Sequence, residues 1–333
     1  MTSSLVIQTS FIGDTILTTP LLSQLAHRGP VDVVVTPASA ALLANHPAVR
    51  NVIVYDKRGS DRGIGGFLAL AKRLKGHQYD VAHLAQGSWR SSALALAAGI
   101  PARLGFATSA GRLFYTKRVD YRDDLHHAAR LLMLARPNGR EPAPDELKPS
   151  LHPGAAERTA VDALLQFAGF DGGPLIGLAP GSIWGTKRWS YFPELAALLA
   201  ARGRVVIVGG ESDSELAAEI VAALPSAIDT TGKLSLLASA ELIRRASVLV
   251  TNDSAPLHLA SAMNTATVAL FGPTIPQFGF GPLAERSTVF GLDQLECRPC
   301  DRHGPMKCPL GHHKCMRELS VGAVREAAAG LMR

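Results

Sequence analysis

The chain has 333 residues and a mass of 35.2 kDa, which is long for a single core and suits two domains of about 150 residues each. Apolar residues make up 47% and charged residues 19%, a globular balance that excludes a disordered chain. No uncharged apolar run approaches the roughly 18 residues that cross a bilayer, and the N-terminus lacks the cationic and long apolar segments of a secretory signal.

The net charge of +6 is unevenly placed along the chain. Residues 1–150 hold 18 basic and 11 acidic side chains, a balance of +7, whereas residues 151–333 hold 16 and 17, a balance of −1. We therefore expect the first half to meet an anionic partner. Charge alone leaves open nucleic acid, anionic lipid headgroups, a phosphorylated substrate and a plain solvated surface.

Short β-branched segments alternate with helical patterns through the first half. Strands are expected at 5–9, 31–36, 51–56, 80–85 and 103–106, and helices at 13–27, 38–46, 63–76 and 88–98. Prolines then crowd the polar stretch 136–154, which predicts a linker between two domains.

The second half repeats this alternation. Strands are expected at 175–180, 204–210, 227–232, 247–252 and 267–272, and helices at 191–202, 212–224, 235–246 and 254–263. Such spacing predicts parallel sheets built from βαβ crossovers. The expected fold class is α/β, with two doubly wound Rossmann-like domains, 1–150 and 151–317, whose carboxyl sheet edges face a central cleft. The Ala-rich segment 318–333 predicts a terminal helix, for which the first domain is one docking surface.

The turn after the first strand contains Gly13 and Asp14 but no G-x-G-x-x-G pattern, which disfavours an NAD or FAD enzyme. Asp14 stands where a helix begins at the carboxyl end of a strand. A carboxylate at this place is either a helix N-terminal acid that meets free amides or a general base aimed at a ligand. The residue by itself favours the first interpretation.

Two turns of the second half suit an anionic ligand. In the stretch 180–189, small residues expose amides and the hydroxyl of Ser182, and Lys187 adds a cation, although the P-loop pattern is not matched. In the stretch 251–262, Asp253 precedes a helix whose first amides could meet an anion. Asp253 could cap this helix, or it could bind the hydroxyls of a sugar.

All four cysteines lie close together in the sequence, at Cys297, Cys300, Cys308 and Cys315. A C-x2-C pair followed by two further cysteines predicts a closed, structural zinc site. Packed free thiols, or disulfides formed on isolation, are the alternatives. Because a disulfide-stapled secreted protein would spread its cysteines along the chain, this placement favours the cytosol.

Six segments, in this order along the chain, resemble the lipopolysaccharide heptosyltransferases of glycosyltransferase family 9, which have the GT-B architecture. They are 9–20, 180–189, 205–213, 251–262, 269–274 and 296–316. The Cys/His segment and the stretch 86–106 are most similar to the heptosyltransferase II branch. The resemblance implies inverting transfer of L-glycero-D-manno-heptose from ADP-β-heptose to the first heptose of the lipopolysaccharide inner core, with no cofactor required for the chemistry.

The resemblance also implies a role for each matched residue. Asp14 matches the general base, and Lys187 matches the cation that faces the donor diphosphate. The other donor positions are Ser182 near the diphosphate, Glu211 at the ribose, Leu234 at the adenine, Asp253 at the heptose hydroxyls, Ser254 and Ala255 with their amides at the diphosphate, and His258 without an assigned role. The family usually has Gly where this chain has Ala255, and we expect an amide rather than a positive φ to be needed there.

A basic first domain suits a phosphorylated, anionic lipid acceptor. The cations expected to contact it are Arg58, Arg62, Arg90 and Arg103. The resemblance therefore implies a cytoplasmic protein held peripherally at the inner membrane of a Gram-negative bacterium. Alternatives are a family member that acts on Kdo-lipid A or on a protein, and a non-catalytic nucleotide- or nucleic-acid-binding protein. The aromatic content of 6% and the lack of a recognisable nucleic-acid-binding motif argue against nucleic acid as a partner.

Overall fold

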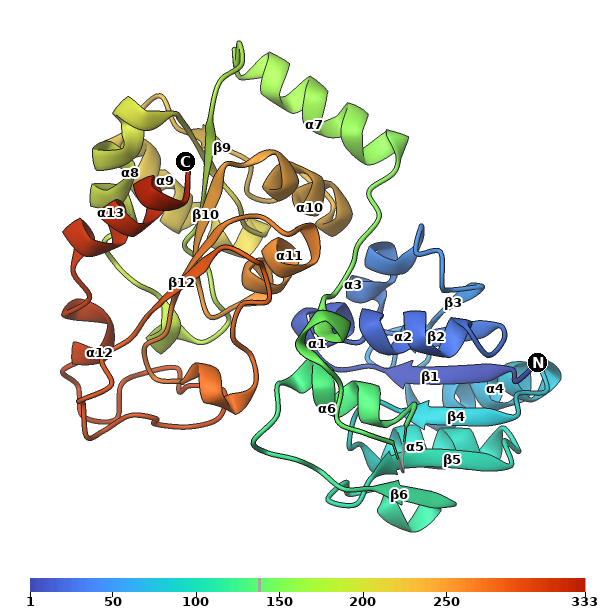
Figure 1. The fold of residues 1–333 in the computed structure, drawn as a ribbon. Coiled ribbons are helices and arrows are strands. Elements are labelled where there is room, and N and C mark those ends of the chain that lie inside the picture. Colours follow the sequence, from blue (N-terminus) through green and yellow to red (C-terminus); the bar gives the residue numbers. More distant parts are fainter. Residues whose placement is uncertain (137–138, 333) are drawn as a thin grey trace. The chain divides into compact units, whose positions relative to one another are not determined.

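A computed structural model describes residues 1–136 and 139–332, so that residues 137 and 138 of the expected linker lie outside the described residues. The chain divides into two compact units, Met1–His152 and Pro153–Arg333. Each unit contains one six-stranded sheet flanked by helices (Figure 1). In the described parts of the chain every strand pair is parallel. The expected fold class of two doubly wound α/β domains is confirmed.

The sheet of the first unit has the strand order β3-β2-β1-β4-β5-β6. Its strands are β1 (Ser4–Gln8), β2 (Val31–Val35), β3 (Asn51–Val54), β4 (Val81–Leu84), β5 (Ala102–Phe106) and β6 (Lys117–Val119). Its helices are α1 (Ile12–Leu17), α2 (Thr19–Ala26), α3 (Pro37–Ala40), α4 (Gly63–Gly76), α5 (Trp89–Ala97) and α6 (His127–Met133). Because the chain builds outward from β1 to β3 and then returns to the other side of β1, the strand order reverses at β1 and β4. Ligands of such sheets bind at the carboxyl ends of strands at this reversal.

The sheet of the second unit has the corresponding order β12-β11-β10-β7-β8-β9. Its strands are β7 (Leu175–Ala179), β8 (Arg204–Ile207), β9 (Ile228–Asp229), β10 (Val248–Asn252), β11 (Thr267–Leu270) and β12 (Ser287–Phe290). Its helices are α7 (Ala155–Phe167), α8 (Phe192–Leu199), α9 (Ser214–Ala223), α10 (Leu236–Arg245), α11 (Ala255–Met263), α12 (Lys314–Arg317) and α13 (Val321–Leu331). Here the strand order reverses between β7 and β10.

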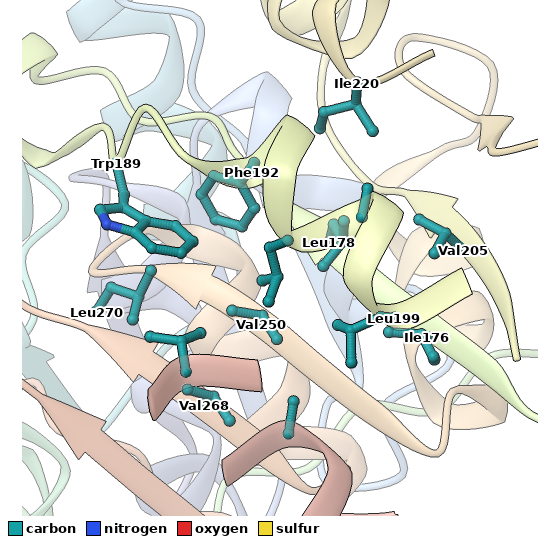
Figure 2. Packing of buried hydrophobic residues seen from close by; sticks show 14 of the residues in the cluster. Ile176, Leu178, Trp189, Phe192, Leu199, Val205, Ile220, Val250, Val268 and Leu270 are labelled. Carbon is teal, nitrogen blue, oxygen red and sulfur yellow. The ribbon is translucent and has the colours of Figure 1, made fainter. Parts of the chain in front are cut away.

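Apolar side chains from the central strands and the covering helices form the core of the second unit. Figure 2 shows Trp189 and Phe192 above the strand residues Val250 and Leu270. The indole of Trp189 is 2% exposed and meets the Phe192 ring edge-on, with centroids 5.4 Å apart. Because Trp189 belongs to the loop that follows β7, its burial fixes that loop on the sheet.

The terminal helix α13 packs on α8, β10 and β11 of the second unit, with Val324 and Ala328 fully buried. The segment 318–333 therefore belongs to the second unit, which extends beyond the expected domain end at residue 317. Its docking on the first domain stays a prediction. Among the described residues, no helix has the length and apolar character required to cross a membrane.

The structure also contains elements that the sequence patterns did not indicate. The helix expected at 13–27 is two helices, α1 and α2, joined at Thr18, whose hydroxyl donates to the Asp14 carbonyl at 2.7 Å. The strands β6 and β12 are short and partly exposed, which weakens their apolar pattern. The helices α6 and α7 flank the Pro-rich linker, whose composition hides their beginnings and ends.

Candidate functional site

A buried ion pair stands where the strand order of the second sheet reverses. The Lys187 amine follows β7 and donates to Asp253 Oδ2 at 2.6 Å, and Asp253 follows β10. Both residues are 7% exposed. The hydroxyl of Thr274, which follows β11, donates to the same oxygen at 2.6 Å. The structure therefore brings together two of the predicted donor residues and adds Thr274, which the sequence analysis did not single out.

Asn252, the last residue of β10, holds both ends of the loop that carries Lys187. Its side-chain amide donates to the Pro180 carbonyl at 2.7 Å, and its carbonyl oxygen accepts the Trp189 backbone N–H at 3.3 Å. Asn252 is fully buried. Since the burial of Trp189 anchors the same loop, Lys187 is placed by the core of the unit rather than by a mobile surface segment.

The turn after β7 approaches the turn after β8 very closely. A Cβ on Gly181 would lie 2.3 Å from Asp213 Oδ1, so a larger residue at this position would require the Asp213 side chain to move. Asp213 is held in turn by the Gly210 N–H, which donates to Oδ2 at 2.9 Å. Ser182, which is 8% exposed, accepts the Trp184 N–H on its hydroxyl at 3.3 Å.

The predicted ribose and adenine positions lie on neighbouring loops of this same edge. Glu211 is exposed after β8, and Leu234 is half-buried after β9. A Cβ on Gly232 would lie 3.1 Å from the Glu211 Cα, which shows that the two loops touch. The carboxyl edge of β7, β8 and β9 thus presents the predicted diphosphate, ribose and adenine contacts side by side.

Helix α11 begins directly after Asp253. Ser254 is its extended N-cap residue, with φ −155° and ψ −178°, and Ala255 is its first helical residue. Ala255 is not among the described residues with positive φ, so the replacement of glycine by alanine carries no backbone strain there. His258 lies one turn further in, 4% exposed, with its ring 6.2 Å from that of Phe280.

In the first unit, Asp14 lies in the first turn of α1, where the strand order of the first sheet reverses. Its Oδ2 accepts the Phe11 N–H at 3.3 Å and lies 2.7 Å from the Ser10 hydroxyl. Its Oδ1 lies 3.5 Å from His127 Nε2, and the two side chains are 15% and 11% exposed. The carboxylate is therefore oriented by its own turn and by the first residue of α6.

Cations gather beside this turn. The Lys57 amine donates to the Thr9 carbonyl at 3.0 Å. Burial lowers the pKa of Lys57, and the neighbouring cations Arg58 and Arg90 lower that pKa further. Arg90 donates to the Tyr55 hydroxyl at 2.6 Å. These contacts place two predicted acceptor cations together with Lys57, which the sequence analysis missed.

The other two predicted acceptor cations have different surroundings. Arg62 is exposed and precedes α4, on the same connection as Arg58. Arg103 lies near the start of β5, and its guanidinium donates to the carbonyls of Ile100 at 2.5 Å and Phe114 at 2.7 Å. These donors hold loops beside the start of β5, and the role of Arg103 at the acceptor stays a prediction.

The four cysteines are reduced in this structure. Among the residues that the structure describes, no group of three or more His, Cys, Asp or Glu side chains could hold a metal ion. Cys300 lies with its sulfur 3.3 Å from the Cys297 carbonyl, and the Cys308 sulfur accepts the His313 N–H at 3.4 Å. Burial raises the pKa of Cys315 to about 11. The zinc site stays a prediction, and metal analysis of the purified protein would test it.

Three comparisons with known proteins give matches that are consistent with one another. The model of glycosyltransferase family 9 (heptosyltransferase) matches residues 67–310. Lipooligosaccharide heptosyltransferase 2 of Haemophilus influenzae is 30% identical over 95% of this chain and 95% of its own. Lipopolysaccharide heptosyltransferase 2 of Escherichia coli is 32% identical over 86% of this chain and 87% of its own. The solved structure of E. coli ADP-heptose lipopolysaccharide heptosyltransferase II has a TM-score of 0.83 and 28% identity, with 100% of this chain and 98% of that chain covered.

Proposed function

The chain belongs to glycosyltransferase family 9, the heptosyltransferases, and from this premise we propose that it transfers L-glycero-D-manno-heptose from ADP-heptose to the first heptose of the lipopolysaccharide inner core. The second unit would bind the donor and the first unit the acceptor. The observation that carries the proposal is the buried pair of Lys187 and Asp253 at the strand reversal of the second sheet, where doubly wound sheets bind their ligands.

The donor diphosphate needs positive partners that are already in place. Lys187 supplies a charge on a loop that the core fixes, and α11 supplies the positive end of its dipole beside the amides of Ser254 and Ala255. Asp253 then has two proposed roles. It accepts a hydrogen bond from the Lys187 amine, and it would bind hydroxyls of the heptose. Ser182, Glu211 and Leu234 complete the donor contacts along the carboxyl edge of the sheet.

The proposed reaction is a single displacement. Asp14 takes the proton of the acceptor hydroxyl while the acceptor oxygen bonds to the anomeric carbon of the heptose. The bond from that carbon to the β-phosphate oxygen breaks, and ADP leaves with the electron pair. Attack on the face opposite the leaving group inverts the anomeric centre. Lys187 and the amides of α11 stabilise the charge that develops on the diphosphate, so that this step requires no metal ion or cofactor from the protein.

The acceptor is anchored in a membrane, and the first unit offers a surface that suits one. Ile64 and Leu68 are one turn apart on α4 and are 78% and 55% exposed, and Trp89 at the start of α5 is 62% exposed. The two helix beginnings are adjacent, because Arg90 donates to the Gly63 carbonyl at 3.3 Å. Exposed apolar side chains among cations are typical of peripheral binding to anionic lipid. We infer a cytoplasmic protein that binds the inner membrane through this surface.

The decisive experiment is heptose transfer from ADP-heptose to mono-heptosylated Kdo-lipid A by the wild type and by Asp14→Asn. We expect transfer by the wild type and a loss of about a thousandfold or more in the variant, because the amide cannot accept the proton. Asp145→Asn, an exposed position of the first unit, is the matched control and should keep full activity.

Other outcomes would each change the proposal. Transfer to Kdo-lipid A alone would make the chain a family member with another acceptor. ADP binding without transfer to any acceptor would favour a non-catalytic nucleotide-binding protein, and salt-sensitive binding to nucleic acid would favour the third alternative. An active Asp14→Asn variant would keep the family and remove Asp14 as the base.

A further inference from the structure

The cysteine-rich segment, residues 297–315, packs on the loop that carries Lys187 and on the loop that carries Thr274. On one side, the Cys300 N–H donates to the Pro273 carbonyl at 2.8 Å. On the other, His313 Nε2 lies 2.8 Å from the Thr186 carbonyl, next to Lys187. The Trp184 and His303 rings also stack, with centroids 5.9 Å apart. The segment therefore spans the loop after β7 and the loop after β11.

Arg298 is the buried cation of this segment. Its side chain is 2% exposed, and its guanidinium donates to three backbone carbonyls of the loop after β11. These are Gly272 at 2.5 Å, Thr274 at 3.0 Å and Phe271 at 3.1 Å. A guanidinium presents its donors from three nitrogens in a rigid plane, whereas an ammonium presents its three donors from one nitrogen, so lysine cannot reproduce this set of contacts at the same spacing.

Thr274 connects this arginine to the donor-site pair. Arg298 binds the Thr274 carbonyl, and the Thr274 hydroxyl donates to Asp253 Oδ2, which also accepts the Lys187 amine. Every member of this chain of contacts is buried. A shift of the loop after β11 would thus change the position of Asp253 and, through it, that of the amine.

We propose that Arg298 is a positioning residue for the Lys187–Asp253 pair, and through that pair for the binding of the donor diphosphate. The role in donor binding rests on the function proposed above. The placement of the Lys187 amine does not, since it follows from contacts within the second unit. The proposal gives the cysteine-rich segment a function in the donor site through Arg298, whether or not its thiols bind a metal.

The test replaces Arg298 with lysine, which keeps the positive charge but removes the planar set of guanidinium donors. The matched control is Arg245→Lys, because Arg245 also donates to several acceptors in the same unit but precedes β10, at the opposite edge of the sheet. For Arg298→Lys we expect the Kd of ADP and the KM of ADP-heptose to rise about tenfold, as for the loss of one or two buried hydrogen bonds. The KM of the acceptor should stay within about twofold of the wild-type value.

A second readout does not depend on the donor. The rate at which an amine-reactive reagent acylates Lys187, followed by mass spectrometry of the intact fold, reports how firmly the amine is held. We expect this rate to rise several-fold in Arg298→Lys and to stay at the wild-type value in Arg245→Lys. Thr274→Val should raise the rate likewise, and the double variant should add little to either single change, since both act through one chain of contacts.

The outcomes separate the two proposals. A lower melting temperature of Arg298→Lys with wild-type acylation of Lys187 and wild-type ADP affinity would overturn the positioning role and leave a purely structural one. If Lys187 is acylated faster in Arg298→Lys but the wild-type protein itself binds no ADP, the positioning role would be supported and the proposed donor would be contradicted.

Discussion

The Lys187 amine lies 2.6 Å from Asp253 Oδ2, although 66 positions separate the two residues in the sequence. They meet because β7 and β10 are parallel neighbours, so that the loops that follow these strands leave the sheet at the same edge. A paired, buried cation costs less than an unpaired one and is already oriented when an anion arrives. The pair is therefore where stability and donor binding are coupled.

Asp253→Asn should destabilise the second unit. The change leaves the buried Lys187 amine without a charged partner, and breaking a buried pair from one side costs about 3 kcal/mol or more. We expect a lower midpoint of thermal unfolding and a loss of transfer. If Lys187→Met is then added, most of the stability should return while transfer stays absent. A double variant no more stable than Asp253→Asn would show that the unpaired charge is not the cause.

Gly181→Ala tests how closely the turns after β7 and β8 must approach. The new Cβ would meet the Asp213 carboxylate at 2.3 Å and push it away from the Gly210 N–H. We expect weaker ADP binding, by about tenfold, because the turn that carries Ser182 would shift. Asp213→Ala added to Gly181→Ala removes the clash but also the carboxylate that accepts the Gly210 N–H, so the double variant should have the unfolding midpoint of Asp213→Ala alone. A lower midpoint in the double variant would locate the strain elsewhere.

Some of this site follows from the sequence because local chemistry marks it. Asp14, Lys187 and Asp253 each follow a clear apolar strand, and their types stand out in turns of small residues. Thr274 and Asn252 do not stand out, because their roles depend on partners far along the chain. Arg298 is hidden in the same way, since its acceptors are backbone carbonyls that no residue type reveals.

The contacts of Arg103 were hidden from the sequence for a related physical reason. A cation in a basic half suggests an anionic ligand, but a guanidinium is equally suited to loop carbonyls. The structure shows that Arg103 donates to the carbonyls of Ile100 and Phe114, contacts that its residue type alone does not reveal. The accuracy of the predicted strands also depends on their burial. The strongly apolar strands β2 and β10 are predicted almost to the residue, whereas the half-exposed β6 and β12 are missed.

Acid should destabilise the first unit through His83 on β4. Burial lowers the pKa of His83 to about 4, whereas an unfolded histidine has its ordinary pKa near 6.5. Between these pH values the unfolded chain binds a proton at His83 that the folded chain does not. The contribution of His83 to the free energy of unfolding is therefore fully present above pH 6.5, and it is lost by about 1.4 kcal/mol per pH unit as the pH falls to about 4. His46, whose pKa is also lowered to about 4, adds to the slope.

The variant His83→Gln isolates this contribution. Glutamine does not titrate and can still donate to the Leu134 carbonyl, which lies 3.1 Å from His83 Nδ1. We expect the free energy of unfolding of the first unit, measured by denaturant titration from pH 4.5 to pH 7, to depend less on pH in His83→Gln than in the wild type. The exposed His27→Gln is the control. An unchanged pH slope in His83→Gln would mean that other groups dominate.

The proposed membrane surface depends on apolar contacts as well as on charge. Replacing Ile64 and Leu68 with serine should lower binding to vesicles of anionic phospholipid by about tenfold, because two side chains lose their burial in the interface. The effect should persist at high salt, where the contribution of the cations is screened. Phe167→Ser, at a residue 95% exposed in the second unit, is the control. Equal losses in both variants, or none in the double replacement, would place the membrane contact on a different surface.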